Sequence, residues 1–445
     1  MSTTLIKNAR IVNEGKIFHA DVFIKGKFIE KIETQGISMP ADRVINAEGK
    51  FLIPGAIDDQ VHFREPGLTH KGEIYTEAKA AVVGGVTSYM EMPNTSPSAT
   101  TIDLLEQKYN RAAEVSLANY SFFMGTTNTN LEELLKVDER KVCGVKIFMG
   151  SSTGDMLVDD PQALENIFSQ VKTLIATHCE DDPMIKRNAA SFKEKYGDDL
   201  TAKYHPLIRS AEACYSSSSF AVELAKKHGT RLHILHISTA KELELFRNDI
   251  PLVEKKITAE ACIHHLWFND ADYETKGNFI KWNPAVKTKA DADAIMAAVL
   301  DGRIDVIATD HAPHTIDEKS QAYINAPSGG PLVQHSVLAM FDFYKNGKIS
   351  LEKVVEKMAH NVAILFEIDR RGFIREGFYA DLVLVDPNQT TKVTKESLLY
   401  KCGWSPFDGH EFSSAITHTF VNGNLVFENG IIHEETKGMR MMFNR

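Results

Sequence analysis

The chain has few of the features that mark a secreted, membrane or nucleic-acid-binding protein. Its 445 residues include five cysteines, and no two of them stand in the CxxC spacing of a zinc ribbon or redox motif. Scattered cysteines in odd number indicate reduced thiols rather than a disulfide framework. No apolar run approaches the length of a membrane span, and the N-terminus lacks the apolar core of a signal peptide. These absences predict a cytoplasmic protein without a membrane partner.

Basic charge is also scarce. Fifty basic residues against sixty acidic ones give a net charge of −10, and no basic cluster breaks that balance. A nucleic-acid binder needs a positive surface, so we expect no nucleic-acid partner. The 43% hydrophobic and 25% charged residues are typical of an ordinary globular chain. The length allows two or three domains, or one barrel with an addition.

The middle of the chain alternates between two kinds of pattern, whereas both ends favour β-structure. Strand-like apolar runs lie at residues 86–92, 145–149, 174–178, 232–237, 257–262 and 304–309. Helical patterns lie between them, at residues 73–83, 102–115, 130–137, 161–171, 211–228 and 287–300. This alternation predicts an α/β fold, a (β/α)8 TIM-type barrel over residues 54–365. Residues 1–53 and 366–445 are expected to pair into a small β-sandwich domain.

One stretch, PGAIDDQVHFREPG at residues 54–67, carries unusual polar residues into the first strand of the predicted barrel. Gln60, His62 and Arg64 share one face of an ideal strand, because strand side chains alternate. An amide, an imidazole and a guanidinium do not suit a core. They suit the wall of a site for a metal and an anion, although an exposed polar strand would show the same pattern.

Later apolar runs also contain or end at a titratable residue. Lys146 interrupts one, His178 and His236 lie at the ends of two others, and Asp310 follows a fourth. Buried unpaired charges cost several kcal/mol, so a shared partner is expected. Converging imidazole and carboxylate ligands suit Zn²⁺ or a similar ion. Lys146 can join only as a neutral amine that takes up CO₂ to form a carbamate.

Each of these residues also has an ordinary structural interpretation. A single strand-end histidine is often a hydrogen-bonded core residue, and Lys146 could be a surface lysine. His233 has the opposite strand parity to His236, so we expect it to face the helices. His264 and His265 are adjacent, so at most one can face a cavity. Residues 150–154 (GSSTG) are expected to form a loop without a phosphate-binding role.

Several motifs in order resemble the dihydroorotases of the amidohydrolase superfamily, over essentially the whole chain. They are HFREPG at residues 62–67, MPNT at 92–95, ATDHAPH at 308–314, and the strands that contain Lys146, His178 and His236. The segment at residues 371–386 resembles the returning strands of that family's β-domain. Related allantoinases and hydantoinases share the histidine but lack this arginine context.

The resemblance implies a function and a set of roles. His62, Lys146, His178, His236 and Asp310 would bind one or two Zn²⁺ ions, with Lys146 carboxylated by CO₂. Metal-activated water would open the ring amide of dihydroorotate, or the reverse reaction would cyclise carbamoyl aspartate, a step of pyrimidine (UMP) biosynthesis. Asp310 would transfer the proton. The substrate-binding residues implied are Arg64, Asn94 and His314, and the loops at residues 283–287 and 326–330 resemble segments that contact the substrate.

One position departs from the family pattern. The first strand normally reads HxH, but Gln60 replaces the first histidine, and an amide oxygen is a poorer zinc ligand than imidazole. We therefore expect Gln60 to be a weak ligand at most, beside one complete metal position. Two alternatives stay open: an inactive scaffold for aspartate transcarbamoylase, and a hydantoinase or allantoinase. A homodimer is expected from family habit, with transcarbamoylase association as an option.

Overall fold

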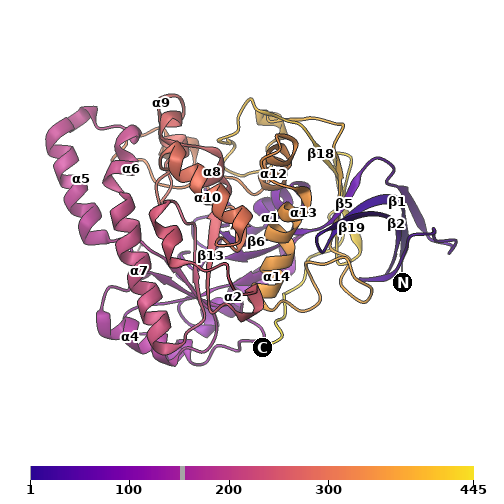
Figure 1. Cartoon of the computed structure of the whole chain (residues 1–445), viewed down its shortest axis with the longest axis horizontal. Helices are drawn as coiled ribbons and strands as arrows, with labels where there is room; N and C mark the ends of the chain where they lie inside the picture. The colour runs from indigo at the N-terminus through magenta and orange to yellow at the C-terminus, as the bar shows by residue number, and fades with distance from the viewer. Residues whose placement is uncertain (1, 151–155) are drawn as a thin grey trace.

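The computed structural model describes residues 2–150 and 156–445, so most of the predicted loop at 150–154 lies outside it. The middle of the chain forms a (β/α)8 barrel, as predicted (Figure 1). Its strands are β6 (Ala56–Val61), β7 (Val86–Glu91), β8 (Asn119–Phe122), β9 (Met124–Gly125), β10 (Val145–Phe148), β11 (Ile175–His178), β12 (Leu232–Ile234), β13 (Ile257–Cys262) and β14 (Val306–Ala308). β8 and β9 are two segments of one barrel strand, interrupted at Phe123.

Two parallel sheets, β6-β7-β8 and β9 to β14 in chain order, together make this barrel. They meet at one side where Phe123 N donates to Glu91 O at 3.0 Å. At the other side His62 N donates to His311 O at 2.7 Å, which links the segments that follow β6 and β14. The carboxyl ends of all these parallel strands therefore open at one mouth, where barrel enzymes carry their sites.

The barrel strands lack the alternation of a half-exposed sheet, because both of their faces are covered. All residues of β7, β10, β11 and β14 are buried. Strands buried on both faces appear in a sequence as continuous apolar runs, which is how six of them were predicted. Several observed strands are shorter than the runs: β12 ends at Ile234, where the sequence suggested 237.

Helices surround the barrel on its outer side (Figure 1). They are α1 (Ile74–Val83), α2 (Ile102–Val115), α3 (Leu131–Leu134), α4 (Pro161–Gln170), α5 (Asp182–Tyr196), α6 (His205–Ile208), α7 (Ala211–His228), α8 (Ile263–Trp267), α9 (Tyr273–Lys276), α10 (Lys289–Asp301), α11 (Ile316–Lys319), α12 (Ser336–Lys345), α13 (Leu351–Val355) and α14 (Asn361–Phe366). Capping residues set where these helices begin and end. Ser210 caps α7 by accepting from Ala213 N, and Gly229, with φ of 69°, ends it.

Both chain ends contribute to one hydrogen-bonded sheet, at the right of Figure 1, with the order β20-β19-β18-β15-β5-β1-β2-β3 and β4 beside β1. The N-terminal members are β1 (Thr3–Asn13), β2 (Lys16–Lys25), β3 (Phe28–Glu33), β4 (Arg43–Asn46) and β5 (Phe51–Pro54). The C-terminal members are β15 (Leu382–Asp386), β18 (Ala415–Val421), β19 (Asn424–Glu428) and β20 (Ile431–Ile432), and a separate pair joins β16 (Thr391–Lys392) to β17 (Glu411–Phe412). The predicted pairing of the ends is thus confirmed.

Within the described residues, no helix is both long enough and apolar enough to cross a membrane. All five cysteines are free and buried. The main hydrophobic core fills the space between the barrel strands and their helices, and a second cluster, which includes Ile6, Ile11, Val22 and Leu384, lies under the sheet of the chain ends.

Candidate metal and substrate site at the barrel mouth

A cavity of about 310 Å³ lies at the mouth of the barrel. It brings together all the side chains that the sequence suggested as metal ligands or substrate-binding residues, and it adds others from the surrounding loops. Its lining comprises Gln60, His62, Arg64, Leu68, Lys71, Asn94, Lys146, Phe148, His178, His236, Trp282, Asn283, Asp310, Ala312, His314, Pro327, Ser328 and Gly329. The size suits a small ligand.

His62 and Asp310 form the first pair of candidate ligands. His62 Nδ1 lies 2.7 Å from Asn94 Oδ1 and donates to it, so the lone pair of this ring is on Nε2. That nitrogen is 3.1 Å from Asp310 Oδ1. Burial lowers the pKa of His62 well below its usual value and raises that of Asp310 to about 7. Two acceptors this close need a proton or a metal ion between them.

His178 and His236 form the second pair. Glu180 Oε2 accepts from His178 Nε2 at 2.9 Å, which leaves the lone pair on Nδ1, 2.9 Å from His236 Nε2. Burial lowers the pKa of both rings, so both are neutral at pH 7. Burial alone would raise the pKa of Glu180, but Arg209 and His178 lower it well below its ordinary value. A carboxylate behind a histidine is the usual support of a metal ligand.

Lys146 lies on β10 among these pairs, and its side chain is buried. Its Nζ has no hydrogen-bond partner among the described residues. Burial lowers the pKa of this amine to about 7. An uncompensated buried amine is costly, and its lowered pKa makes the neutral, nucleophilic form available near neutral pH. The donor set therefore fits divalent metal ions, with Lys146 between the two pairs.

Three of the cavity residues have a backbone conformation that side chains rarely adopt. The φ angles are 70° at Arg64, 40° at His236 and 47° at Asp310. Such residues cost about 1–3 kcal/mol each and concentrate at functional sites. His236 and Asp310 both follow the end of their strand, so this turn directs their side chains into the mouth.

The other side of the cavity is positively charged. Arg64 Nε donates to Pro313 O at 3.0 Å, and its Nη2 lies 3.1 Å from His314 Nε2. Burial lowers the pKa of Arg64 to about 10, so it remains a cation at pH 7. Lys71 donates to His314 Nδ1 at 3.1 Å, and His314 Nε2 donates to Ser328 O at 3.0 Å. This region can bind an anion.

Gln60 contacts the first pair through its amide nitrogen. Its Nε2 donates to Asp310 Oδ1 at 3.2 Å, and its oxygen faces the thiol of Cys262 at 3.7 Å. In this conformation the side chain supports Asp310. Its part as a weak metal ligand stays a prediction.

Some residues that line the cavity were not predicted from the sequence. Lys71 and Trp282 come from loops outside the recognised motifs, and Phe148 appeared there only as part of an apolar run. Trp282 donates from Nε1 to Asp310 O at 3.3 Å. Of the two expected loops, Asn283 and residues 327–329 line the cavity, and their contact with a substrate stays a prediction. Neither His264 nor His265 is among its lining residues.

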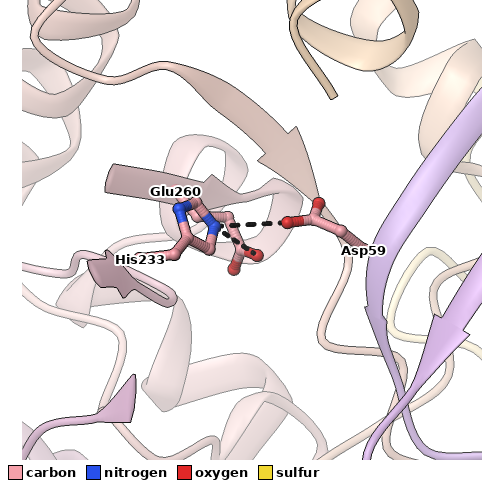
Figure 2. A group of neighbouring side chains, drawn as sticks. All are labelled: Asp59, His233 and Glu260. Carbon is pink, nitrogen blue, oxygen red and sulfur yellow. Dashed lines mark ion pairs between the residues drawn. The ribbon is translucent and has the colours of Figure 1, made fainter. Parts of the chain in front are cut away.

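The expectation for His233 was wrong. Its ring does not face the helices but is fully buried inside the barrel, with Nε2 3.2 Å from Asp59 Oδ2 and 3.8 Å from Glu260 Oε2 (Figure 2). Strand parity failed because β12 ends at Ile234, so alternation cannot be counted through to His236. Asp59, His233 and Glu260 also form a compact group of possible metal ligands, all within 4.8 Å of one another.

The fold and the cavity fit a barrel enzyme with candidate metal ligands at its mouth, and sequence comparison gives the class of enzyme. The chain belongs to the amidohydrolase family, whose model matches residues 51–426. Among curated relatives, the dihydroorotase of Methanosarcina acetivorans is 32% identical over 416 residues, which is 91% of this chain and 88% of that protein. The dihydroorotase of Staphylococcus epidermidis is 32% identical and covers 95% of this chain and 99% of its own.

Solved structures give the same fold. The L-hydantoinase (dihydropyrimidinase) of Arthrobacter aurescens superposes with a TM-score of 0.92 at 27% identity, over 97% of this chain and 98% of that one. The dihydropyrimidinase of Brevibacillus agri, at 23% identity and a TM-score of 0.88, shows the shared fold alone.

Proposed function

We propose that this chain is a metal-dependent dihydroorotase, which opens the ring of L-dihydroorotate to N-carbamoyl-L-aspartate and closes it in reverse. The observation that carries this proposal is the buried Arg64 beside the two ligand pairs, in one cavity of about 310 Å³. Dihydroorotate has a carboxylate next to its cyclic amide, so a site that binds it needs an anion contact beside a hydrolytic centre. The relatives named dihydroorotase support the assignment.

Arg64 is assigned to the substrate carboxylate, because a planar guanidinium can bind both oxygens at once. Asn94 and His314 are assigned to the same anion site. Lys71, which forms an ion pair with Glu318 at 3.0 Å, donates to His314 and holds its ring in place. Low exposure strengthens these charge contacts by excluding water. The clamp fixes the ring so that its amide faces His62, Lys146 and the second histidine pair.

The two ligand pairs and Lys146 are assigned to Zn²⁺ or a similar ion, one or two per chain. His62 and Asp310 would hold one position, His178 and His236 the other, and Lys146, as a carbamate, both. A bound ion supplies Lewis-acid chemistry, which lowers the pKa of water and polarises the amide carbonyl. Asn94 and Glu180 fix the tautomers of His62 and His178, so that their lone pairs face inward.

Asp310 is assigned to proton transfer. Burial raises its pKa to about 7, which suits a group that takes up and returns a proton near neutral pH. It would accept the proton of the attacking water and deliver it to the ring nitrogen that leaves. In the cyclisation direction the same carboxyl would take the proton from the carbamoyl nitrogen. Gln60 donates to Oδ1 of this carboxylate and orients it.

Substitution of Arg64 tests the clamp. In Arg64→Met, we expect kcat/KM for dihydroorotate to fall at least about a hundredfold, since a lost charged contact costs about 3 kcal/mol. Arg64→Lys keeps the charge without the planar fork and should retain intermediate activity. Ring opening is followed by the loss of amide absorbance in zinc-supplemented protein.

Hydantoin and dihydrouracil, which lack the carboxylate, serve as control substrates. A hydantoinase-type enzyme would prefer them, and Arg64→Met would leave its activity unchanged; that result would overturn the dihydroorotase assignment. No turnover of any of these compounds by a folded, metal-loaded chain would instead favour the scaffold for a transcarbamoylase. A cytoplasmic location and a homodimer remain part of the proposal, to be tested by fractionation and light scattering.

A further inference from the structure

A second cluster of ligand-type side chains lies inside the barrel, apart from the cavity. Asp59 comes from β6, His233 from β12 and Glu260 from β13, and none of the three has exposed surface. Figure 2 shows the two carboxylates facing the same ring nitrogen of His233. The distances from that Nε2 are 3.2 Å to Asp59 Oδ2 and 3.8 Å to Glu260 Oε2. None of the three residues lines the cavity at the mouth.

These atoms are poorly satisfied for such a buried place. Both carboxylate oxygens of Asp59, Nε2 of His233 and Oε2 of Glu260 lack a hydrogen-bond partner within the described part of the chain. Buried polar atoms nearly always have partners, and three carboxylate oxygens without them are costly. The other polar atoms of the cluster are engaged: His233 Nδ1 contacts Thr258 Oγ1 at 2.8 Å, and Glu260 Oε1 accepts from His236 N at 2.9 Å. The unsatisfied atoms are the ones that face each other.

The spacing of these atoms matches a coordination sphere. Ligands about 2.1 Å from a tetrahedral ion are about 3.4 Å from one another, and the two measured distances lie on either side of that value. All three ligand atoms lie within 4.8 Å of one another, which is close enough for them to share one ion. One imidazole and two carboxylates are a ligand set for zinc, manganese or iron.

A local irregularity of β6 explains how Asp59 reaches the barrel interior. In the pairing of β6 with β7, Asp58 lies opposite Tyr89 and Val61 opposite Glu91, so two residues stand where the partner strand has one. Such a bulge breaks the simple alternation of strand side chains. Gln60 therefore turns to Asp310 at the mouth, while Asp59, its neighbour, turns to His233.

We propose that Asp59, His233 and Glu260 bind a divalent transition-metal ion in the barrel interior, separate from the ions assigned to the mouth. The ion holds three strands together. It also fixes Glu260, whose other oxygen accepts from the backbone of His236, the residue with φ of 40°. The site is therefore a structural support beneath one of the catalytic ligand pairs. The inference does not depend on which substrate the mouth accepts.

Anomalous diffraction gives the most direct test. Crystals of the unaltered chain, grown with Zn²⁺, are measured on both sides of the zinc absorption edge. We expect a peak about 2.0–2.2 Å from Asp59, His233 and Glu260. A map with peaks at the mouth and none in the cluster overturns the proposal, because the cluster is then only an imidazolium between two carboxylates.

Metal content in solution gives an independent test. The variant His62→Ala/His178→Ala loses one histidine from each pair at the mouth, and after gel filtration we expect it to keep about one Zn²⁺ per chain by elemental analysis. Adding Asp59→Asn should remove that ion. The matched control adds Glu242→Gln, a buried carboxyl that accepts from Ser218 and Thr239 instead, and should leave the ion in place.

The outcomes are distinct. Loss of zinc with Asp59→Asn and retention with Glu242→Gln supports the site. Equal zinc content in both variants, or none in the double variant, overturns it. If Asp59→Asn does not fold, Glu260→Gln replaces it, and the anomalous map of the unaltered chain decides the question without any substitution in the cluster.

Discussion

His233 and His236 lie three residues apart on one segment, yet the barrel gives them opposite electrostatic states. Burial lowers the pKa of His236 well below its usual value, and the neighbouring His178 and Lys146 lower it further. Burial acts on His233 in the same direction, but Asp59 and Glu260 more than offset it and raise its pKa to about 9. One ring is therefore neutral with a lone pair to offer, and the other, when no metal ion is bound, takes up a proton between two carboxylates that a divalent ion would displace.

This contrast separates two levels of the barrel interior. At the mouth, neutral histidines face one another or a carboxyl whose pKa is raised, so lone pairs converge and protons are few. Deeper inside, the carboxylates outnumber the single imidazole, and the pKa of Glu260 is raised to about 7 by burial and by Asp59. A buried cation is favoured in both places, but for different reasons: donor geometry at the mouth and excess negative charge below.

Of the substitutions considered, removal of Lys146 should impair the candidate metal site at the mouth most severely. In Lys146→Ala we expect loss of zinc from the mouth and a fall in kcat of about a thousandfold or more, since Lewis-acid catalysis contributes several kcal/mol. Elemental analysis and the ring-opening assay measure both effects. Short carboxylic acids such as acetate should restore part of the activity, because they can occupy the place of the carbamate.

Lys357→Met is the matched control for this substitution. Lys357 is also a buried lysine, but its Nζ donates to Ile304 O, and neither residue lines the cavity. It should cost stability in thermal unfolding and leave zinc content and kcat unchanged. Full activity of Lys146→Ala would contradict the assignment of Lys146 as a metal ligand.

The fold was largely predictable, because barrel strands buried on both faces leave continuous apolar runs. The third barrel strand was the exception. β8 includes Asn119 and Ser121, and Asn119 donates to Asp381 of the end sheet at 3.2 Å. A strand that uses polar side chains to attach the second domain lacks the apolar pattern on which prediction depends. The sequence predicted that the two chain ends pair, but it did not predict the order and register of the strands in their shared sheet.

The candidate site was predictable where chemistry and strand ends coincide, as at His178 and Asp310. It was not predictable where backbone irregularity decides direction. Asp59 enters the interior through a bulge. His233 lies within its strand whereas His236 follows the strand's end with a φ of 40°, so parity counted from His236 misplaces His233. Lys71 acts through His314, a contact between segments 243 residues apart that carries no local pattern.

Introducing a histidine at position 60 should strengthen metal binding at the position formed by His62 and Asp310. In Gln60→His we expect the zinc affinity of the His62 and Asp310 position to rise about ten- to a hundredfold, since imidazole is a better ligand than an amide. Titration of metal-free protein with zinc, followed by elemental analysis, measures the change. Gln60→Ala, which removes the contacts with Asp310 and Cys262 without adding a ligand, should not raise the affinity.

Two tightly bound zinc ions in the unaltered chain, with no change on Gln60→His, would contradict the weakened position. The contrast between the two levels of the barrel would then remain, but the departure at residue 60 would have no consequence for metal binding. Loss of zinc on Gln60→His would show that the support which Gln60 gives Asp310 matters more than an added ligand.

The lowered pKa of Lys146 predicts how the rate of carbamate formation at the mouth depends on pH. With the pKa at about 7, about a tenth of the amine is neutral at pH 6 and about nine tenths at pH 8. Only the neutral amine attacks CO₂, and the carbamate forms with release of a proton. At constant dissolved CO₂ and zinc, recovery of activity by metal-free protein should therefore be about tenfold faster at pH 8 than at pH 6, and level off above pH 8.

The recovery rate rises with pH because burial disfavours the ammonium and makes the neutral amine available near neutrality. A lysine with an ordinary pKa of about 10.4 would instead show recovery that keeps rising about tenfold per pH unit through pH 9. Lys146→Ala, tested in parallel, should show no CO₂-dependent recovery at any pH. A recovery rate independent of pH between 6 and 8 would mean that no amine titrates there, and that the upper level is held together without a carbamate.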